Sequence, residues 1–239
     1  MSSDGAALLS ATFHEAGHDH LVELVHQRDA QARRHLASLR LDVYERGGRR
    51  LQRLDVDPRQ EILDLDALLG DLAGAHGRVM VVFDARYDPR IFPYRPHHYA
   101  YLHRRGSAAA PLYYAVNATL GGVPDRIEGI ASVAMNNFES YLFLDRRLAE
   151  RYALVLGNLS RFAHADAQVF TYYGGERRAR DVALAPKQHV EVALDAQDGG
   201  RRLQRVEVKA VFRLTSYVTA RAAAGDDLVL FDHLFTYFK

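Results

Sequence analysis

The fold is decided by the stretch Arg-Val-Met-Val-Val-Phe-Asp-Ala-Arg, which occupies residues 78–86. Two glycines, Gly74 and Gly77, precede this apolar run, and an Asp88-Pro89 break follows it. A short apolar run between turn residues is typical of a well-buried strand. We therefore expect residues 78–86 to form a central strand of a sheet.

A second copy of this pattern begins 127 residues later in the chain. Residues 205–213 read Arg-Val-Glu-Val-Lys-Ala-Val-Phe-Arg, and Gly174-Gly175 follows Gly47-Gly48 at the same spacing. Glycine pairs of this kind are typical of hairpin turns. A period of this length is too long for a solenoid repeat, and it indicates two domains of one fold.

Short segments of alternating polarity surround both copies. Leu39, Leu41 and Val43 alternate with polar residues, as in a half-buried strand, and residues 97–104 alternate in the same way. Many short strands with frequent turn signals predict an antiparallel sandwich. We expect an all-β protein of two tandem antiparallel β-sandwich domains related by internal duplication. The expected parts are a flexible lead-in at 1–10, a first domain at 11–117, a linker at 118–131 and a second domain at 132–239, with a short helical turn at 66–72 and a long final strand at 228–238.

The composition narrows the class of partner. The chain of 239 residues carries 31 Lys and Arg against 30 Asp and Glu, so its net charge of +1 gives no reason to expect nucleic acid as a partner. The absence of cysteine excludes disulfides and thiolate metal sites. The first residues lack a signal-peptide pattern, and no apolar run approaches the roughly 18–20 residues of a membrane span. The sequence therefore predicts a cytoplasmic protein without a membrane span, in which the glycosylation pattern at Asn158-Leu159-Ser160 carries little meaning.

One family has a similar order of segments. After the first glycine pair, residues 54–66 read Leu-Asp-Val-Asp-Pro-Arg-Gln-Glu-Ile-Leu-Asp-Leu-Asp, and the apolar strand at 78 ends in the tail Ala-Arg-Tyr-Asp at 85–88. This order resembles the soluble transducer domain of sensory rhodopsins and its relatives, over about 50 residues of each half. The second copy has Phe-Arg-Leu-Thr at 212–215 and lacks the final Asp. The resemblance implies a cytoplasmic, homo-oligomeric β-sandwich that has no established enzymatic role and binds small ligands or other proteins.

A possible metal motif lies near the start of the chain. Residues 14–18 read His-Glu-Ala-Gly-His and fit the pattern H-E-x-x-H. On a helix, His14 and His18 would share a face and hold Zn²⁺, and Glu15 would act as general base for a bound water. Gly17 and Asp19 disfavour a helix, and no later helix offers an obvious third ligand. The alternative function is therefore a zinc-dependent hydrolase with Glu15 as its catalytic residue.

If the same segment is a strand, a different set of histidines shares a face. His18 and His20 would then lie on one side, as in an H-x-H metal pair. In the segment 97–104, four side chains share one face and His98 faces the other way. An imidazole cluster formed by residues of both segments could hold Zn²⁺ or Fe²⁺. The alternative interpretation is a polar, partly exposed strand face that binds no metal. The four side chains of the shared face are His97, Tyr99, Tyr101 and His103.

Tyrosine, arginine and histidine gather in the first half of the chain, and this composition suits stacking on sugar rings and hydrogen bonding to hydroxyls. The same composition is also typical of a subunit interface. We expect a non-enzymatic module without a cofactor, which binds a carbohydrate-like small molecule or a signalling protein partner. A structural assembly subunit is a further alternative. The expected ligand-binding residues are Arg86, Arg95, His97, Tyr99, Tyr101 and His103, and the alternative metal ligands are His14, His18 and His20.

Overall fold

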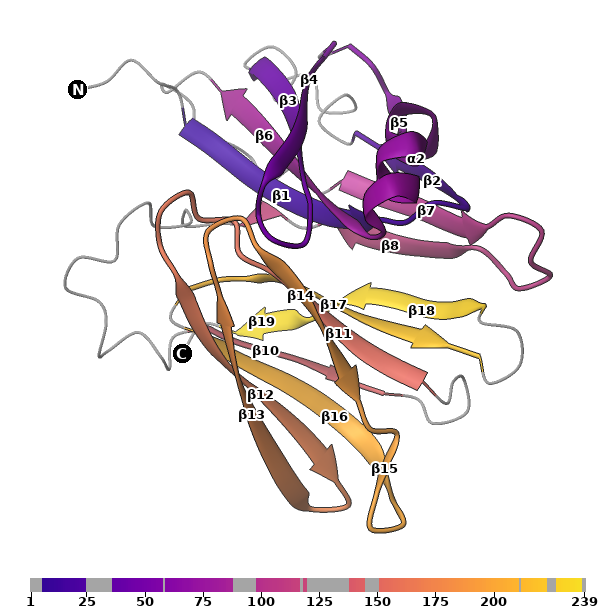
Figure 1. The fold of residues 1–239 in the computed structure, drawn as a ribbon, viewed down its shortest axis with the longest axis vertical. Coiled ribbons are helices and arrows are strands. Elements are labelled where there is room, and N and C mark those ends of the chain that lie inside the picture. The colour runs from indigo at the N-terminus through magenta and orange to yellow at the C-terminus, as the bar shows by residue number, and fades with distance from the viewer. Residues whose placement is uncertain are drawn as a thin grey trace. The chain divides into compact units, whose positions relative to one another are not determined.

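The computed structural model (Figure 1) describes residues 6–24, 36–57, 59–87, 98–116, 118–119, 138–144, 151–210, 212–222 and 227–237. The chain divides into two compact units. Unit 1 comprises Met1–Gly106 and Tyr113–Gly122, and unit 2 comprises Ser107–Leu112 and Val123–Lys239. Almost all of the regular structure in the described ranges is strand, so the all-β prediction is confirmed.

Unit 1 consists of two antiparallel sheets and helix α2, which spans Leu65–His76. The first, here called the β6 sheet, has the strand order β4-β3-β6-β1-β9, and the second, here called the β7 sheet, has the order β5-β2-β7-β8. The strands are β1 (Ala6–His14), β2 (His18–Glu23), β3 (Leu36–Tyr44), β4 (Arg50–Val56), β5 (Ile62–Asp64), β6 (Val79–Tyr87), β7 (His98–Arg104), β8 (Leu112–Val116) and β9 (Ala118–Thr119).

Unit 2 also consists of two antiparallel sheets. The β16 sheet has the order β13-β12-β16-β10-β19, with β15 paired to β16, and the β17 sheet has the order β14-β11-β17-β18. The strands are β10 (Phe138–Phe143), β11 (Arg151–Gly157), β12 (Ala165–Tyr173), β13 (Glu176–Leu184), β14 (His189–Leu194), β15 (Gln197–Asp198), β16 (Arg201–Ala210), β17 (Thr215–Arg221), β18 (Leu228–His233) and β19 (Phe235–Tyr237).

Strand β6 is central, as its apolar sequence predicts. It pairs with β1 on one side and β3 on the other, and its residues 79–85 are all buried (Figure 1). Strand β16 holds the corresponding middle position in its own sheet, although it ends at Ala210. The order of strands along each pair of sheets is the same in both units when α2 is exchanged for β15. This agreement is a likeness of topology, and a shared origin of the two units stays a prediction.

Three expected boundaries are corrected by the strand pairing. The lead-in is shorter than residues 1–10, because β1 begins at Ala6, which is paired with Tyr87. Ala118 and Thr119 were expected in the linker, yet they form β9 against β1. The long final strand is two strands on different sheets, because β18 pairs with β17 and β19 pairs with β10.

Helix α2 is longer than the expected turn at residues 66–72. It begins after Asp64, whose side chain accepts a hydrogen bond from the backbone N–H of Ala67 (3.0 Å) and so caps the first turn. Leu65, Leu69 and Ala73 recur at every fourth position and form its buried stripe. The helix packs beside β2 (Figure 1), which places its first turn next to the hairpin between β1 and β2.

In unit 2 the two sheets share one hydrophobic core, which makes this unit a sandwich. Its members come from the inner positions of strands on both sheets, as the alternation of buried residues along each strand requires. They include Leu154 and Leu156 of β11, Val206 and Val208 of β16, and Val218 and Ala220 of β17. No helix in the described ranges has the length and apolar character that a membrane crossing needs.

Candidate functional site

The H-E-x-x-H segment forms a β-hairpin and not a helix. Strand β1 ends at His14, strand β2 begins at His18, and a turn joins them. Gly17 adopts a φ of 81°, a left-handed conformation that favours glycine and suits a turn. His14 and His18 therefore do not lie one helical turn apart on a common face, which removes the geometry on which the zinc hydrolase hypothesis depends.

Glu15, the proposed general base of that hydrolase, lies in an ion pair. Arg78, the first residue of the stretch that decides the fold, donates from Nε to Glu15 Oε1 (2.6 Å) and also from Nη2. Both side chains are largely shielded from solvent. The pair joins the hairpin turn to the start of β6, so in this arrangement Glu15 has a structural role.

The three histidines considered as metal ligands lie inside unit 1. His14, His18 and His20 are buried. His14 Nδ1 lies 3.3 Å from His20 Nδ1, and His20 Nε2 lies 2.8 Å from the hydroxyl of Tyr114. That hydroxyl is also 2.6 Å from Thr12 Oγ1. Thr12, Tyr114, His20 and His14 therefore form one continuous row of polar groups between the β6 sheet and the β7 sheet, here called the buried chain.

Every member of the buried chain is uncharged at neutral pH. Burial lowers the pKa of His14 to about 4, against a smaller opposing effect of the Asp66 carboxylate. Burial also lowers the pKa of His20 well below its ordinary value and raises the pKa of Tyr114. Neutral imidazoles have one N–H and one bare nitrogen each, so the hydrogen bonds of the chain depend on which nitrogen of each ring carries the proton.

The buried chain ends beside Asp66, in the first turn of α2. His14 Nε2 lies 3.7 Å from Asp66 Oδ1 and has no hydrogen-bond partner. Arg105 donates to both oxygens of the same carboxylate. Asp66 and Arg105 lie in the wall of a hollow of about 510 Å³. The hollow, here called the Asp66 hollow, is lined by Ala16, Gln52, Asp66, Ala67, Leu68, Gly70, Asp71, Leu72 and Arg105.

The metal cluster drawn from two segments is not assembled. His18 and His20 point to the inner face of the β7 sheet, and His103 lies on the outer face, because successive residues of a strand point to opposite sides. His18 donates from Nδ1 to Ala16 O (3.3 Å). In the ranges that the structure describes, no three His, Asp or Glu side chains converge as metal ligands. His97 lies outside those ranges.

The outer face of the β7 sheet carries three exposed tyrosines, here called the tyrosine platform. Tyr99 and Tyr101 of β7 are 36% and 37% exposed, and Tyr113 of β8 is 64% exposed. The rings of Tyr99 and Tyr113 are stacked, with centroids 5.4 Å apart and planes 8° from parallel. On the neighbouring strand β2, Glu23 is the cross-strand partner of Tyr99. The predicted alternation of residues 98–103 is confirmed by their burial.

The expected ligand-binding residues are brought together only in part. Tyr99, Tyr101 and His103 share the outer face of the β7 sheet. Arg86 lies on β6, in the other sheet of unit 1, and its guanidinium pairs with Asp84 (3.2 Å) on that sheet's outer face. Arg86 therefore belongs to the opposite side of the sandwich, which corrects its place in the expected site. Arg95 lies outside the described residues.

The sequence did not identify the residues that surround the buried histidines. Thr12, Asp66, Arg105 and Tyr114 come from four separate segments and match no motif. A partial signal existed for Tyr114, since the alternation of residues 112–116 places it on the same face as Val116. No comparable pattern connects Asp66 or Arg105 with His14, because these contacts depend on the packing of α2.

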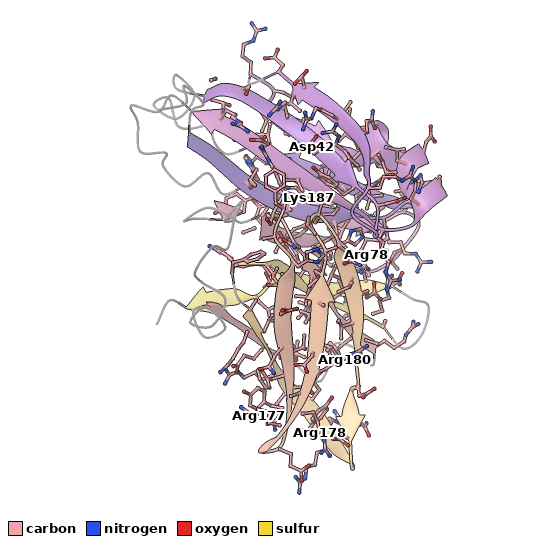
Figure 2. All side chains as sticks on the ribbon, turned by 60° about the vertical axis from the view of Figure 1, so that its left-hand side comes forward. Asp42, Arg78, Arg177, Arg178, Arg180 and Lys187 are labelled. Carbon is pink, nitrogen blue, oxygen red and sulfur yellow. The ribbon has the colours of Figure 1, made fainter. Side chains whose placement is uncertain are left out.

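Arginine pairs in unit 2 are held by local partners. Arg177, Arg178 and Arg180 project from the exposed strand β13 (Figure 2). Arg178 Nε donates to Asp198 Oδ2 (2.6 Å), and the Arg177 guanidinium lies over the Phe170 ring at 4.7 Å from its centroid. These contacts with an acidic and an aromatic neighbour agree with a solvated strand edge, as interspersed acidic residues predict.

Comparison with known proteins gives little information on identity. No family model matches the chain, and no curated protein matches it. A solved structure, the crystal structure of Thermotoga maritima 1070, matches with a TM-score of 0.32 and 10% identity. The match covers 43% of this chain and 92% of that one. A likeness at this level identifies neither the fold nor the function of this chain.

Proposed function

We propose that unit 1 is a non-enzymatic binding module that holds a sugar ring against the tyrosine platform. The observation that carries this proposal is the exposed, stacked pair of Tyr99 and Tyr113. Exposed aromatic rings are costly to leave in water, and their faces suit the apolar C–H surface of a sugar. Tyr101 extends the same face by one more ring along β7.

Polar groups around the platform can form hydrogen bonds with the hydroxyls of a sugar. Glu23 lies across from Tyr99 on β2, and Asp19 lies across from His103. The Asp19 side chain is half exposed, and its Oδ2 lies 4.0 Å from His103 Nδ1. Carboxylate oxygens accept hydrogen bonds from sugar hydroxyls, while a His ring can donate or accept. This combination of aromatic faces and acceptors favours a neutral polyhydroxylated ligand.

The proposal assigns binding to unit 1 alone. In the common strand order, β17 of unit 2 takes the place of β7. Its first six residues, from Thr215 to Ala220, are all buried, so β17 presents no row of exposed tyrosines. The same strand order in both units supports an origin of the chain by duplication of one domain. We infer that only the first copy has kept or gained the binding face.

The test is isothermal titration calorimetry of the full chain with cellohexaose, maltohexaose, xylohexaose and chitohexaose. We expect saturable binding of at least one hexasaccharide, lost in Tyr101→Ala and Tyr113→Ala. Phe162→Ala is the matched control, because Phe162 is an aromatic residue of unit 2 that is 68% exposed and is not part of the platform. Absence of binding by all four sugars, or equal binding by the platform variants, would refute the carbohydrate proposal. Tyrosine-dependent binding of a second copy or another protein would instead support an interaction module.

A further inference from the structure

The hydrogen bonds of the buried chain can run in only one direction when Asp66 is charged. His14 Nε2 faces Asp66 Oδ1 at 3.7 Å, and an N–H at this position is attracted to the carboxylate, whereas a lone pair is repelled. A proton on Nε2 leaves His14 Nδ1 bare, so it accepts from the Nδ1–H of His20 (3.3 Å). His20 Nε2 is then bare and accepts from the Tyr114 hydroxyl (2.8 Å).

The same logic fixes the last link. Because the Tyr114 proton is used toward His20, the Tyr114 oxygen accepts from the hydroxyl of Thr12 (2.6 Å). All the protons of the buried chain therefore point toward Asp66. The opposite direction would turn the bare Nε2 of His14 toward the carboxylate. The charge of one carboxylate in the wall of the hollow thus determines the tautomers of two buried histidines.

The Asp66 hollow has the charge of a cation site. Two carboxylates, Asp66 and Asp71, line it against one guanidinium, Arg105. The Arg105 side chain is 51% exposed and already lies on Asp66. The Arg105 guanidinium is therefore bound to the Asp66 carboxylate in the way that the cationic group of a ligand would be. Leu68 and Leu72 add apolar surface for a short aliphatic body.

A second observation points to the same carboxylate from the interior. His14 is fully buried, and its Nε2 has no hydrogen-bond partner, yet it is aimed at the inner side of Asp66. A buried polar atom without a partner calls for an explanation, and a carboxylate that moves slightly inward on exchanging its outer partner supplies one. His14 on the inner side and a ligand in the Asp66 hollow on the outer side would therefore contact the same carboxylate.

We propose that the Asp66 hollow is a second binding site of unit 1, for a small aliphatic ligand with an ammonium or guanidinium group. The cation of the ligand displaces Arg105 from Asp66, and His14 Nε2 donates to the same carboxylate from the interior. The buried chain consequently reports occupancy, since any change in the charge or position of Asp66 reaches His14 and His20. The site shares no residue with the tyrosine platform. The proposal of an amine site can therefore be supported or refuted independently of the carbohydrate proposal.

The experiment is a titration of the full chain, labelled with ¹⁵N in its histidines, followed by imidazole ¹⁵N NMR. The chain has 12 histidines, so spectra of His14→Gln and His20→Gln assign the two signals. Without ligand we expect His14 as the Nε2–H tautomer and His20 as the Nδ1–H tautomer. Agmatine and putrescine are the probes, acetate is the anionic control, and Zn²⁺ tests a metal ion at the same groups.

We expect agmatine or putrescine to shift the imidazole signals of His14 and His20, and acetate to leave them unchanged. Asp66→Asn should weaken this binding at least about tenfold, because it removes a charged hydrogen-bond acceptor. Arg105→Gln should strengthen it, because it removes the competing guanidinium, and this sign distinguishes the proposal from a merely structural Asp66. Tyr101→Ala should have no effect.

Three results would overturn the proposal. The first is an absence of imidazole shifts with both amines at millimolar concentration. The second is weaker amine binding in Arg105→Gln, which would make Arg105 part of the site and not its competitor. The third is a response to Zn²⁺ alone, which would make the hollow a metal site of His14 and Asp66. The opposite tautomers in the free chain would refute the inferred direction of the hydrogen bonds.

Discussion

The Nδ1 atoms of His14 and His20 lie 3.3 Å apart in the interior of unit 1. Two bare nitrogens at this distance would repel, and two N–H groups would clash, so one ring donates and the other accepts. Burial lowers the pKa of both rings, which keeps them neutral at pH 7. The packing of β1 against β2 therefore depends on two histidines that stay uncharged and take complementary tautomers.

The first prediction is that acid destabilises unit 1. The pKa of His14 is about 4 in the folded chain, against an ordinary value of 6.5. Between these values the unfolded chain binds a proton that the folded chain does not, so the free energy of unfolding falls as pH falls. The contribution is fully present above pH 6.5 and is lost toward pH 4. One such group gives a slope of up to about 1.4 kcal/mol per pH unit, and His20 adds to it with the same sign.

Urea unfolding at several pH values between about 7.5 and about 4.5, followed by the amide signals of unit 1, measures this slope. His14→Gln should flatten it, since the glutamine cannot be protonated in the unfolded chain. His103→Gln, on the outer face of the β7 sheet, is the control, and it should keep the full slope. An unchanged slope in His14→Gln would show that other groups cause the acid sensitivity.

The second prediction concerns the hydroxyl of Tyr114, which serves two buried partners. Tyr114→Phe removes the donor to His20 Nε2 and the acceptor for Thr12 Oγ1, and leaves both without a partner. We expect a loss of about 1–3 kcal/mol in the free energy of unfolding of unit 1. Thr12→Val removes the Thr12 hydroxyl, which is one of the two groups left without a partner, and keeps a side chain of similar shape.

A double-mutant cycle of Tyr114→Phe and Thr12→Val tests the link between the two residues. The double variant should lose less stability than the sum of the single variants, by about 0.5 kcal/mol or more. Additive losses would mean that the 2.6 Å contact of Thr12 with Tyr114 contributes no coupling.

The third prediction concerns Asn158 in unit 2, where the chain turns after β11. Its Nδ2 donates to the carbonyls of Ala163 (2.8 Å), Leu184 (3.2 Å) and Ala185 (3.1 Å), and its Oδ1 accepts from Ser160 N (2.9 Å). Asn158→Asp replaces this donor with a carboxylate that faces three carbonyl oxygens. We expect a loss of about 3 kcal/mol or more in the free energy of unfolding of unit 2.

The pH dependence of that variant gives a specific check. The introduced carboxyl group regains one donor when it is protonated, so the loss should shrink as pH falls, when it is measured on amides of unit 2. Asp166→Asn, on the exposed side of β12, is the matched control and should change little. A loss in the Asn158→Asp variant that does not depend on pH would contradict the donor argument.

The strands were predictable from the sequence, and the contacts of the buried chain were not. The apolar run at β6 and the alternation in β7 are local patterns, which can be recognised from consecutive residues of the sequence. The faces of Tyr99, Tyr101 and His103 followed from the same period of two. The pairing of His14 with Asp66 depends on the position of α2, which no local pattern specifies. Arg86 was wrongly assigned to the ligand site because it is close in sequence to the residues of β7. In the structure β6 and β7 belong to different sheets.

The last prediction concerns the ion pair of Glu15 and Arg78, which joins the hairpin turn to the start of β6. Arg78→Met leaves a partly buried carboxylate without its main partner, and we expect a loss of about 1–3 kcal/mol in the free energy of unfolding of unit 1. Arg49→Met breaks the exposed pair with Glu45 and is the control, for which we expect no measurable change. The exchange Glu15→Arg with Arg78→Glu should recover part of the loss, because the attraction is restored with its direction reversed. If the exchange is as unstable as Arg78→Met, the site requires more than opposite charges, and the fixed geometry of the turn would be the dominant cause.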